Sequence, residues 1–183
     1  SFVIAIIIIL MIYDSNLSIL EDKLLAASSP NDPQENSDQI AVQMMESVQN
    51  FISAVEEDPD NYSLNVKAGN ANFDIGRFDQ AVRFYKKALQ LHAHDVNVEI
   101  DLGVCYFNLS KLDSALYYML SAINKEPDHK QVLYNVGVVY FNMNNKDEAA
   151  KYWNHLVHLY PESNEGKSAI KFLEEIQKQK SGN

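Results

Sequence analysis

Apolar and polar residues recur along this chain with a step of 34 residues. The same residue types recur at equivalent positions of each 34-residue step, which makes the pattern specific. A period of this length is typical of a unit of two helices joined by a turn, and such units stack on one another. We therefore expect an all-α array of stacked helices. The positions that keep the step include Gly69, Gly103 and Gly137; Phe73, Phe107 and Phe141; Ala81, Ala115 and Ala149; and Ala93, Pro127 and Pro161.

Three full repeats are predicted from this step. In each of them, the first helix has Gly at its eighth position, where we expect a second helix to cross too closely for a side chain. The second helix has Ala at position 20 of the repeat and a large residue, Tyr85, Met119 or Trp153, at position 24. Small residues opposite large ones let neighbouring helices interlock without voids. The three repeats occupy residues 62–95, 96–129 and 130–163.

The flanking segments complete the array. Residues 38–61 place apolar side chains on one helical face, and Ser47 and Phe51 fall on slots of the second helix one period earlier. They predict an N-terminal capping helix that is a degenerate half repeat. Residues 28–37 contain two prolines among small and polar residues, which predicts a linker. Residues 164–183 are expected to form a C-terminal capping helix and a short tail.

Residues 1–13 form an unbroken apolar run without a charge. Thirteen helical residues rise about 20 Å, which is less than the roughly 30 Å of a bilayer's hydrocarbon core. If further residues precede Ser1, residues 1–27 form part of a transmembrane anchor helix and a juxtamembrane extension. A cleavable signal peptide and a buried core helix are the alternatives. The acidic flank, which includes Asp14 and Asp22, favours a soluble part on the non-cytoplasmic side.

Charge and motif content narrow the function classes. The net charge of −10 argues against nucleic acid, because phosphate binding needs clustered Lys and Arg. The single Cys105 excludes an intrachain disulfide and is expected to be a small core residue. The pairs His92–His94 and His155–His158 lack a third ligand at metal spacing. There is no phosphate loop, haem-attachment motif or catalytic triad motif. We expect no enzyme, no cofactor and no metal.

At the repeat positions the sequence resembles the tetratricopeptide repeat (TPR) family. The resemblance implies a right-handed superhelix whose concave surface binds peptides or protein segments, and it does not imply catalysis. Some positions depart from the family pattern: Asn65, Glu99 and Leu133 replace its Trp, and Asn72 and Ala93 replace a Tyr and a Pro in the first repeat. These departures weaken the packing expected of the first repeat. The matching residues are Gly69, Ala81, Tyr85 and Ala88; Leu102, Gly103, Tyr106, Ala115, Ala122 and Pro127; and Val136, Gly137, Tyr140, Ala149 and Pro161.

The last repeat, with Trp153 and the helix after it, also resembles the membrane-anchored TPR proteins of bacterial cytochrome c maturation. We expect a membrane-anchored TPR scaffold at a bacterial inner membrane, with its TPR part on the periplasmic side. It would mediate protein–protein interaction and assemble, or remain a subunit of, a multi-protein complex. The alternative is a chaperone that holds apocytochrome for haem attachment. Neither nucleic acid nor a small-molecule substrate is expected.

In the TPR family, set positions of the first helices line the concave groove. Here these positions hold three Phe flanked by amides, which would suit an amphipathic helix or an extended apolar segment of a partner. The alternative is that the Phe side chains only pack between first helices. The expected groove residues are Asn70, Phe73, Asn97, Ile100, Val104, Phe107, Asn108, Tyr134, Val138, Phe141 and Asn142.

One TPR subclass grips a C-terminal carboxylate with Lys, Asn and Arg at defined groove positions. No cation stands at the matching positions of this chain, so we do not expect such a clamp. The positions hold Val66, Asn70, Asp101, Gln131 and Asn135.

Overall fold

The computed structural model describes residues 33–181, and this part of the chain has eight helices and no strand. The predicted anchor over residues 1–27 lies outside the described residues. Within residues 33–181, no helix combines the length and the hydropathy that crossing a membrane requires. The helices are α2 (Pro33–Glu57), α3 (Tyr62–Asp74), α4 (Phe78–Leu91), α5 (Val96–Asn108), α6 (Leu112–Lys125), α7 (Lys130–Asn142), α8 (Lys146–Leu159) and α9 (Asn164–Ser181).

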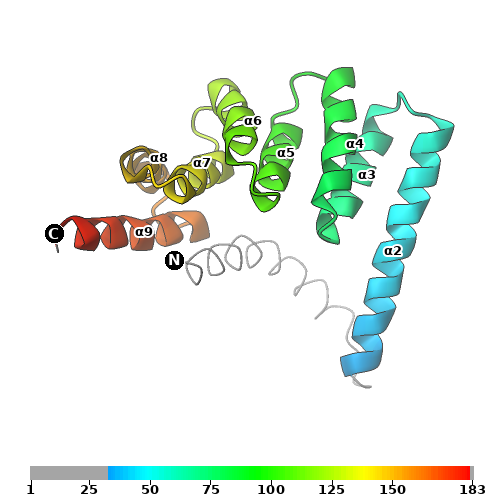
Figure 1. Cartoon of the computed structure of the whole chain (residues 1–183), viewed down its shortest axis with the longest axis horizontal. Coiled ribbons are helices and arrows are strands. Elements are labelled where there is room, and N and C mark those ends of the chain that lie inside the picture. Colours follow the sequence, from blue (N-terminus) through cyan, green and yellow to red (C-terminus); the bar gives the residue numbers. More distant parts are fainter. Residues whose placement is uncertain (1–32, 182–183) are drawn as a thin grey trace.

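The helices follow one another along an arched row, with α2 at one end and α9 at the other (Figure 1). Within each repeat the first helix packs on the second: α3 on α4, α5 on α6 and α7 on α8. Successive repeats meet through α4 against α5 and α6 against α7. Because each helix contacts mainly its chain neighbours, the expected all-α array of stacked helical pairs is confirmed.

Each pair is held at close range by a glycine on its first helix. A Cβ atom on Gly103 would lie 2.7 Å from Cγ of Met119, and one on Gly137 would overlap the indole of Trp153. Real Cβ atoms do not approach other side chains so closely. The first repeat has the same arrangement. The predicted opposition of glycine and a large side chain at the helix crossing is confirmed.

The turns inside the repeats place one residue in the left-handed region, at the same step of the period. Gly76 has φ 74°, Ser110 has φ 59° and Asn144 has φ 60°. In the first turn, the next amide, Arg77 N–H, donates to the carbonyl oxygen of Asn72 at 2.8 Å, and the other turns repeat this bond. The bond satisfies a carbonyl that the helix end would otherwise leave free. Glycine adopts this conformation at the lowest cost.

The two end helices, α2 and α9, complete the array. α2 begins at Pro33, inside the predicted linker of residues 28–37, so the helix is longer than expected. Proline suits the first position of a helix because its missing N–H has no intrahelical partner there. At the other end, α9 lies against α8, and the ring of Phe172 stacks on Trp153 with centroids 4.8 Å apart.

The residues just before the first helices α3, α5 and α7 and before α9 share one slot of the repeat, which holds Asn61, Asp95, His129 and Ser163. The side chains of Asn61, Asp95 and Ser163 accept a hydrogen bond from a first-turn amide at 3.1, 3.0 and 2.9 Å. His129 makes no such bond, and its Nδ1 is buried without a hydrogen-bond partner among the described residues. Helix α7 therefore starts with an uncapped first turn and a buried ring nitrogen that lacks a partner.

Replacing His129 with a capping residue should therefore stabilise the fold. We expect His129→Asn to raise the free energy of unfolding by about 0.5–1 kcal/mol, because an Asn cap satisfies a first-turn amide. The reciprocal change, Asn61→His, should lower it by a similar amount. Urea unfolding followed by circular dichroism measures both values. If both changes shifted the free energy of unfolding by the same amount in the same direction, His129 would not be the weak cap of this slot.

Candidate protein-interaction surface

The structure divides the expected groove residues into three classes by exposure. The apolar residues of α5 and α7 are largely buried, and the amides are not. Asn70 and Asn97 are exposed, whereas Phe73, Asn108, Phe141 and Asn142 are half-buried. A partner can bury only surface that is exposed, so the polar members offer more to a partner than the apolar ones. The buried members are Ile100, Val104, Phe107, Tyr134 and Val138.

The three Phe side chains are engaged in packing. Phe107 is only 7% exposed and belongs to the main core cluster. Phe141 contacts the rings of Trp153 and Phe172, each at a centroid distance of 5.7 Å. Phe73 makes an edge-to-face contact with another ring of its own repeat at 5.5 Å. These contacts favour packing over a role as free aromatic anchors, because each ring already lies against other apolar side chains.

Truncation of Phe107 should consequently affect stability. We expect Phe107→Ala to lower the free energy of unfolding by about 3 kcal/mol, because it removes a buried ring and leaves a cavity. Asn97→Ala, an exposed change on the same helix, should stay within about 0.5 kcal/mol of the parent. Urea unfolding of the two variants measures this difference. A Phe107→Ala chain as stable as the parent would place this ring outside the core.

Three of the four amides at the groove positions have one side engaged. Asn70 Oδ1 accepts a hydrogen bond from the hydroxyl of Tyr85 at 2.8 Å, and no described group accepts from its NH₂. Asn108 and Asn142 instead donate through Nδ2 to carbonyls of their own helices at 2.9 and 2.8 Å. Asn97 is exposed at the start of α5. A row of this kind can both donate to and accept from the backbone of a partner chain.

The five positions that would form a carboxylate clamp hold one acidic residue and four neutral ones. Asp101 lies at the central one and is half-buried. Burial, and then the neighbouring carboxylates of Asp95 and Asp74, raise the pKa of Asp101 to about 7. Lys67 lies at the same repeat position as Asp101, one repeat earlier, and is exposed. The sequence alone did not point to this cation, because Lys67 lies outside the set positions of a carboxylate clamp.

The raised pKa of Asp101 predicts a pH dependence of stability. In the unfolded chain an Asp has a pKa of about 3.9. Between about pH 4 and pH 7 the folded state therefore holds a proton that the unfolded state has released, so the free energy of unfolding falls as pH rises. We expect Asp101→Asn to be more stable than the parent by about 1–2 kcal/mol near pH 8, with no gain near pH 4.

Urea unfolding of the parent and of Asp101→Asn across this pH range measures the effect. Glu174→Gln, which changes an exposed carboxylate on α9, is the matched control and should follow the parent at every pH. A gain from Asp101→Asn that is the same at low and high pH would contradict the assignment.

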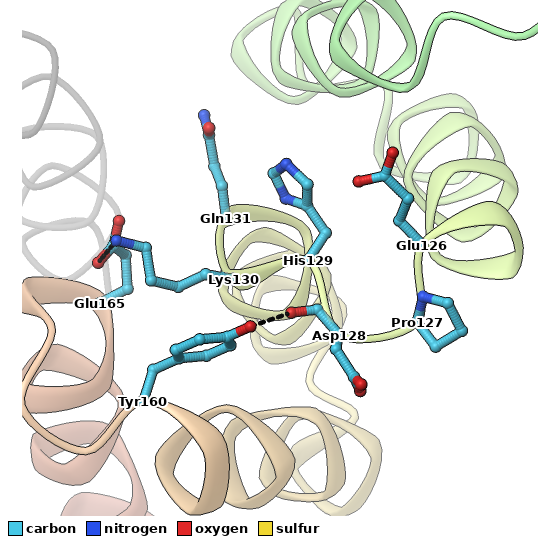
Figure 2. A pocket seen from close by; sticks show the side chains of 8 residues that line it. All are labelled: Glu126, Pro127, Asp128, His129, Lys130, Gln131, Tyr160 and Glu165. Carbon is cyan, nitrogen blue, oxygen red and sulfur yellow. Dashed lines mark hydrogen bonds and ion pairs between the residues drawn. The ribbon is translucent and has the colours of Figure 1, made fainter.

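An open pocket of about 620 Å³ lies where the second and third repeats and α9 meet (Figure 2). Its polar groups already contact one another. The hydroxyl of Tyr160 donates to the carbonyl oxygen of Asp128 at 3.0 Å, and Lys130 pairs with Glu165 at 3.2 Å. Glu126 and the carboxylate of Asp128 give the remaining rim a negative character. These pairs join neighbouring repeats, and the pocket presents no convergent set of reactive groups.

A smaller pocket of about 180 Å³ lies between α2 and α3. Met44 and Phe51 of α2 and Ala71 of α3 give it an apolar lining. Its polar lining comes from Ser47, Lys67, Asn70 and Asp74. This pocket therefore adjoins the exposed end of the amide row.

The remaining candidate groups have structural roles. Glu99 is 6% exposed and pairs with Lys125 at 2.8 Å, and Ser121 donates to the same carboxylate oxygen at 2.8 Å. Cys105 is buried, and burial raises the pKa of its thiol, which keeps it protonated. Its expected role as a small core residue is confirmed. Within residues 33–181, no three His, Cys, Asp or Glu side chains are placed to share a metal ion.

Comparison with known proteins supports the repeat assignment. Models of the tetratricopeptide repeat match residues 72–116 and 131–163, so the resemblance to TPR repeats is confirmed. No curated protein matches the chain.

Several solved structures share the fold. A crystal structure of MamA has a TM-score of 0.63 at 18% identity and covers 81% of this chain and 96% of its own. Another, of MamA MSR-1, has a TM-score of 0.61 at 21% identity over 64% of this chain and 67% of its own. A tetratricopeptide repeat protein from Parabacteroides merdae ATCC 43184 has a TM-score of 0.67 at 19% identity, over 80% of this chain and 59% of its own. At these identities the likeness concerns the fold.

Proposed function

We propose that this TPR-containing chain is a protein-interaction scaffold that holds a segment of a partner polypeptide along the first helices α3, α5 and α7. The observation that carries the proposal is the row of half-engaged amides on these helices. Among the described residues, no group accepts from the NH₂ of Asn70, and none donates to the side-chain oxygens of Asn108 and Asn142. An extended or helix-terminal backbone offers both acceptors and donors, so it can satisfy both kinds of amide. Arrays of this family are typically non-enzymatic, and the proposal needs no catalytic group.

On the proposed surface, hydrogen bonds to amides supply the affinity that aromatic contacts would supply in an apolar groove. The Phe side chains at the groove positions are committed to packing, so the partner would gain few aromatic contacts. Hydrogen bonds to amides contribute modestly to net affinity, about 1 kcal/mol each, but they specify backbone position. The scaffold would therefore hold its partner with moderate affinity, and membership of a larger complex would supply further contacts.

Membrane anchoring is a second part of the proposal. The support for it is the uncharged apolar run of residues 1–13, which lies outside the described residues, and the acidic flank that follows. The TPR part would then lie on the periplasmic side of a bacterial inner membrane. The names of the matching repeat models and of the matching structures do not mention cytochrome maturation. The apocytochrome chaperone therefore rests only on the likeness of the last repeat.

Site-specific photo-crosslinking tests the scaffold directly. A benzophenone amino acid in place of Asn97, at the start of α5, should crosslink the full chain in its native membranes to one discrete partner. The same group in place of Gln90, an exposed residue of α4, should not. Mass spectrometry of the crosslinked band identifies the partner and its contact segment. Equal crosslinking from both positions, or none from Asn97, would contradict the proposed surface.

A further inference from the structure

The pocket between α2 and α3 exists because α2 is a half repeat. Ser47 and Phe51 occupy the slots that Ala81 and Tyr85 fill one period later. Tyr85 is 1% exposed because its ring packs over the glycine of its own first helix. Among the described residues no first helix pairs with α2 in this way, and Phe51 is left half-buried. The space beside it is the pocket of about 180 Å³.

The size and lining of this pocket suit one side chain. Pockets for drug-sized ligands measure roughly 300–1,000 Å³, so this one is too small for a separate organic ligand. Met44, Phe51 and Ala71 line it with apolar surface. Methionine is flexible and polarizable, and it adapts to side chains of different shape. A single large aliphatic side chain from another polypeptide meets these conditions.

The rim of the pocket holds an oriented hydrogen-bond donor. Tyr85 donates its hydroxyl hydrogen to Asn70 Oδ1 at 2.8 Å, which turns the amide NH₂ of Asn70 away from that contact. This pair is specific to the first repeat. The slot of Tyr85 holds Met119 and Trp153 in the other repeats, and that of Asn70 holds Val104 and Val138. Neither later repeat can form the same contact.

The rim also holds one cation, Lys67, and one carboxylate, Asp74. Lys67 lines the pocket, is exposed, and has no ion-pair partner among the described residues. The same position holds Asp101 and Asn135 in the later repeats. Asp74 lies about two helical turns further along α3, so an acidic residue of a partner would pair at the Lys67 end of the rim.

We propose that the α2–α3 pocket is a specificity subsite that accepts one large aliphatic side chain from a partner segment carrying an acidic residue beside it. The aliphatic side chain lies against Met44 and Phe51. Asn70 donates to a backbone carbonyl of the segment, and Lys67 pairs with the acidic side chain. This subsite rests on the proposed scaffold function and names the kind of segment that the scaffold recognises.

Methyl-labelled methionine gives a direct readout of this pocket. The chain has five methionines. Met44 lines the pocket, whereas Met45, 47% exposed, does not line it and serves as an internal control. The probe is a capped hexapeptide with the sequence serine, glycine, glutamate, leucine, glycine, serine. Titration of the full chain with this peptide should shift the methyl signal of Met44 and leave that of Met45 in place.

Three changes separate the parts of the proposal. Replacing leucine by alanine in the peptide should abolish the Met44 shift, and replacing glutamate by lysine should weaken binding about tenfold. Lys67→Glu should raise the Kd of the glutamate peptide by about tenfold or more. Lys86→Glu, at an exposed lysine of α4, is the matched charge control and should leave the Kd within about twofold. Circular dichroism checks that both variants are folded.

A Met44 signal that stays in place up to about 1 mM glutamate–leucine peptide would overturn the proposal. This holds whether the pocket admits no side chain or another part of the chain fills it. Tighter binding of the lysine peptide would overturn the charge assignment. The Asn97 crosslink is independent of this pocket. A discrete crosslinked partner together with a silent Met44 would therefore reject the subsite and leave the scaffold function standing.

Discussion

The close crossing of the two helices within each repeat is the constraint on which the rest of the structure depends. A glycine on the first helix lets a large side chain of the second helix lie directly against its backbone. In the third repeat, Trp153 is fully buried in this way, and its Nε1 donates to the carbonyl oxygen of Tyr134 at 3.1 Å. Burying a side chain of this size contributes on the order of 2–3 kcal/mol. The crossing therefore fixes the geometry of a pair before neighbouring pairs stack on it.

The stacking of pairs then decides which residues remain available to a partner. The first helices of successive repeats lie close enough that apolar side chains such as Ile100 and Val138 are buried. These side chains stabilise the array, and they cannot also give a large apolar surface to another protein. Polar side chains at neighbouring positions, such as Asn70 and Asn97, remain at the surface. The array is thus stabilised by apolar contacts, and at the expected groove positions its exposed side chains are amides.

The period of the sequence was sufficient to predict the helical pairs and their glycine contacts, because both follow from which residues share a slot. It was not sufficient to predict exposure. The slot of Phe107 is one that lines a groove in the family, yet its ring is buried by the neighbouring repeat. Periodicity also could not show that Tyr85 would donate a hydrogen bond to Asn70, since that contact depends on the rotamers of two side chains on different helices. α2 begins at Pro33, because proline suits the first position of a helix. Proline is also typical of linkers, so the sequence did not distinguish the two.

Differences between equivalent slots are the part of such an array that can carry specificity. The slot of Tyr85 is filled by a large side chain in every repeat, because packing demands it, but only the tyrosine has a hydroxyl to orient a surface amide. Lys67 itself is exposed, so packing does not restrict it, whereas the same slot holds the half-buried Asp101 and the buried Asn135 in the later repeats. The end of the array at α2 adds a pocket that the inner repeats fill for themselves. Recognition concentrated at α2 and α3 is therefore compatible with a stable stack, because it uses only positions that the stack leaves free.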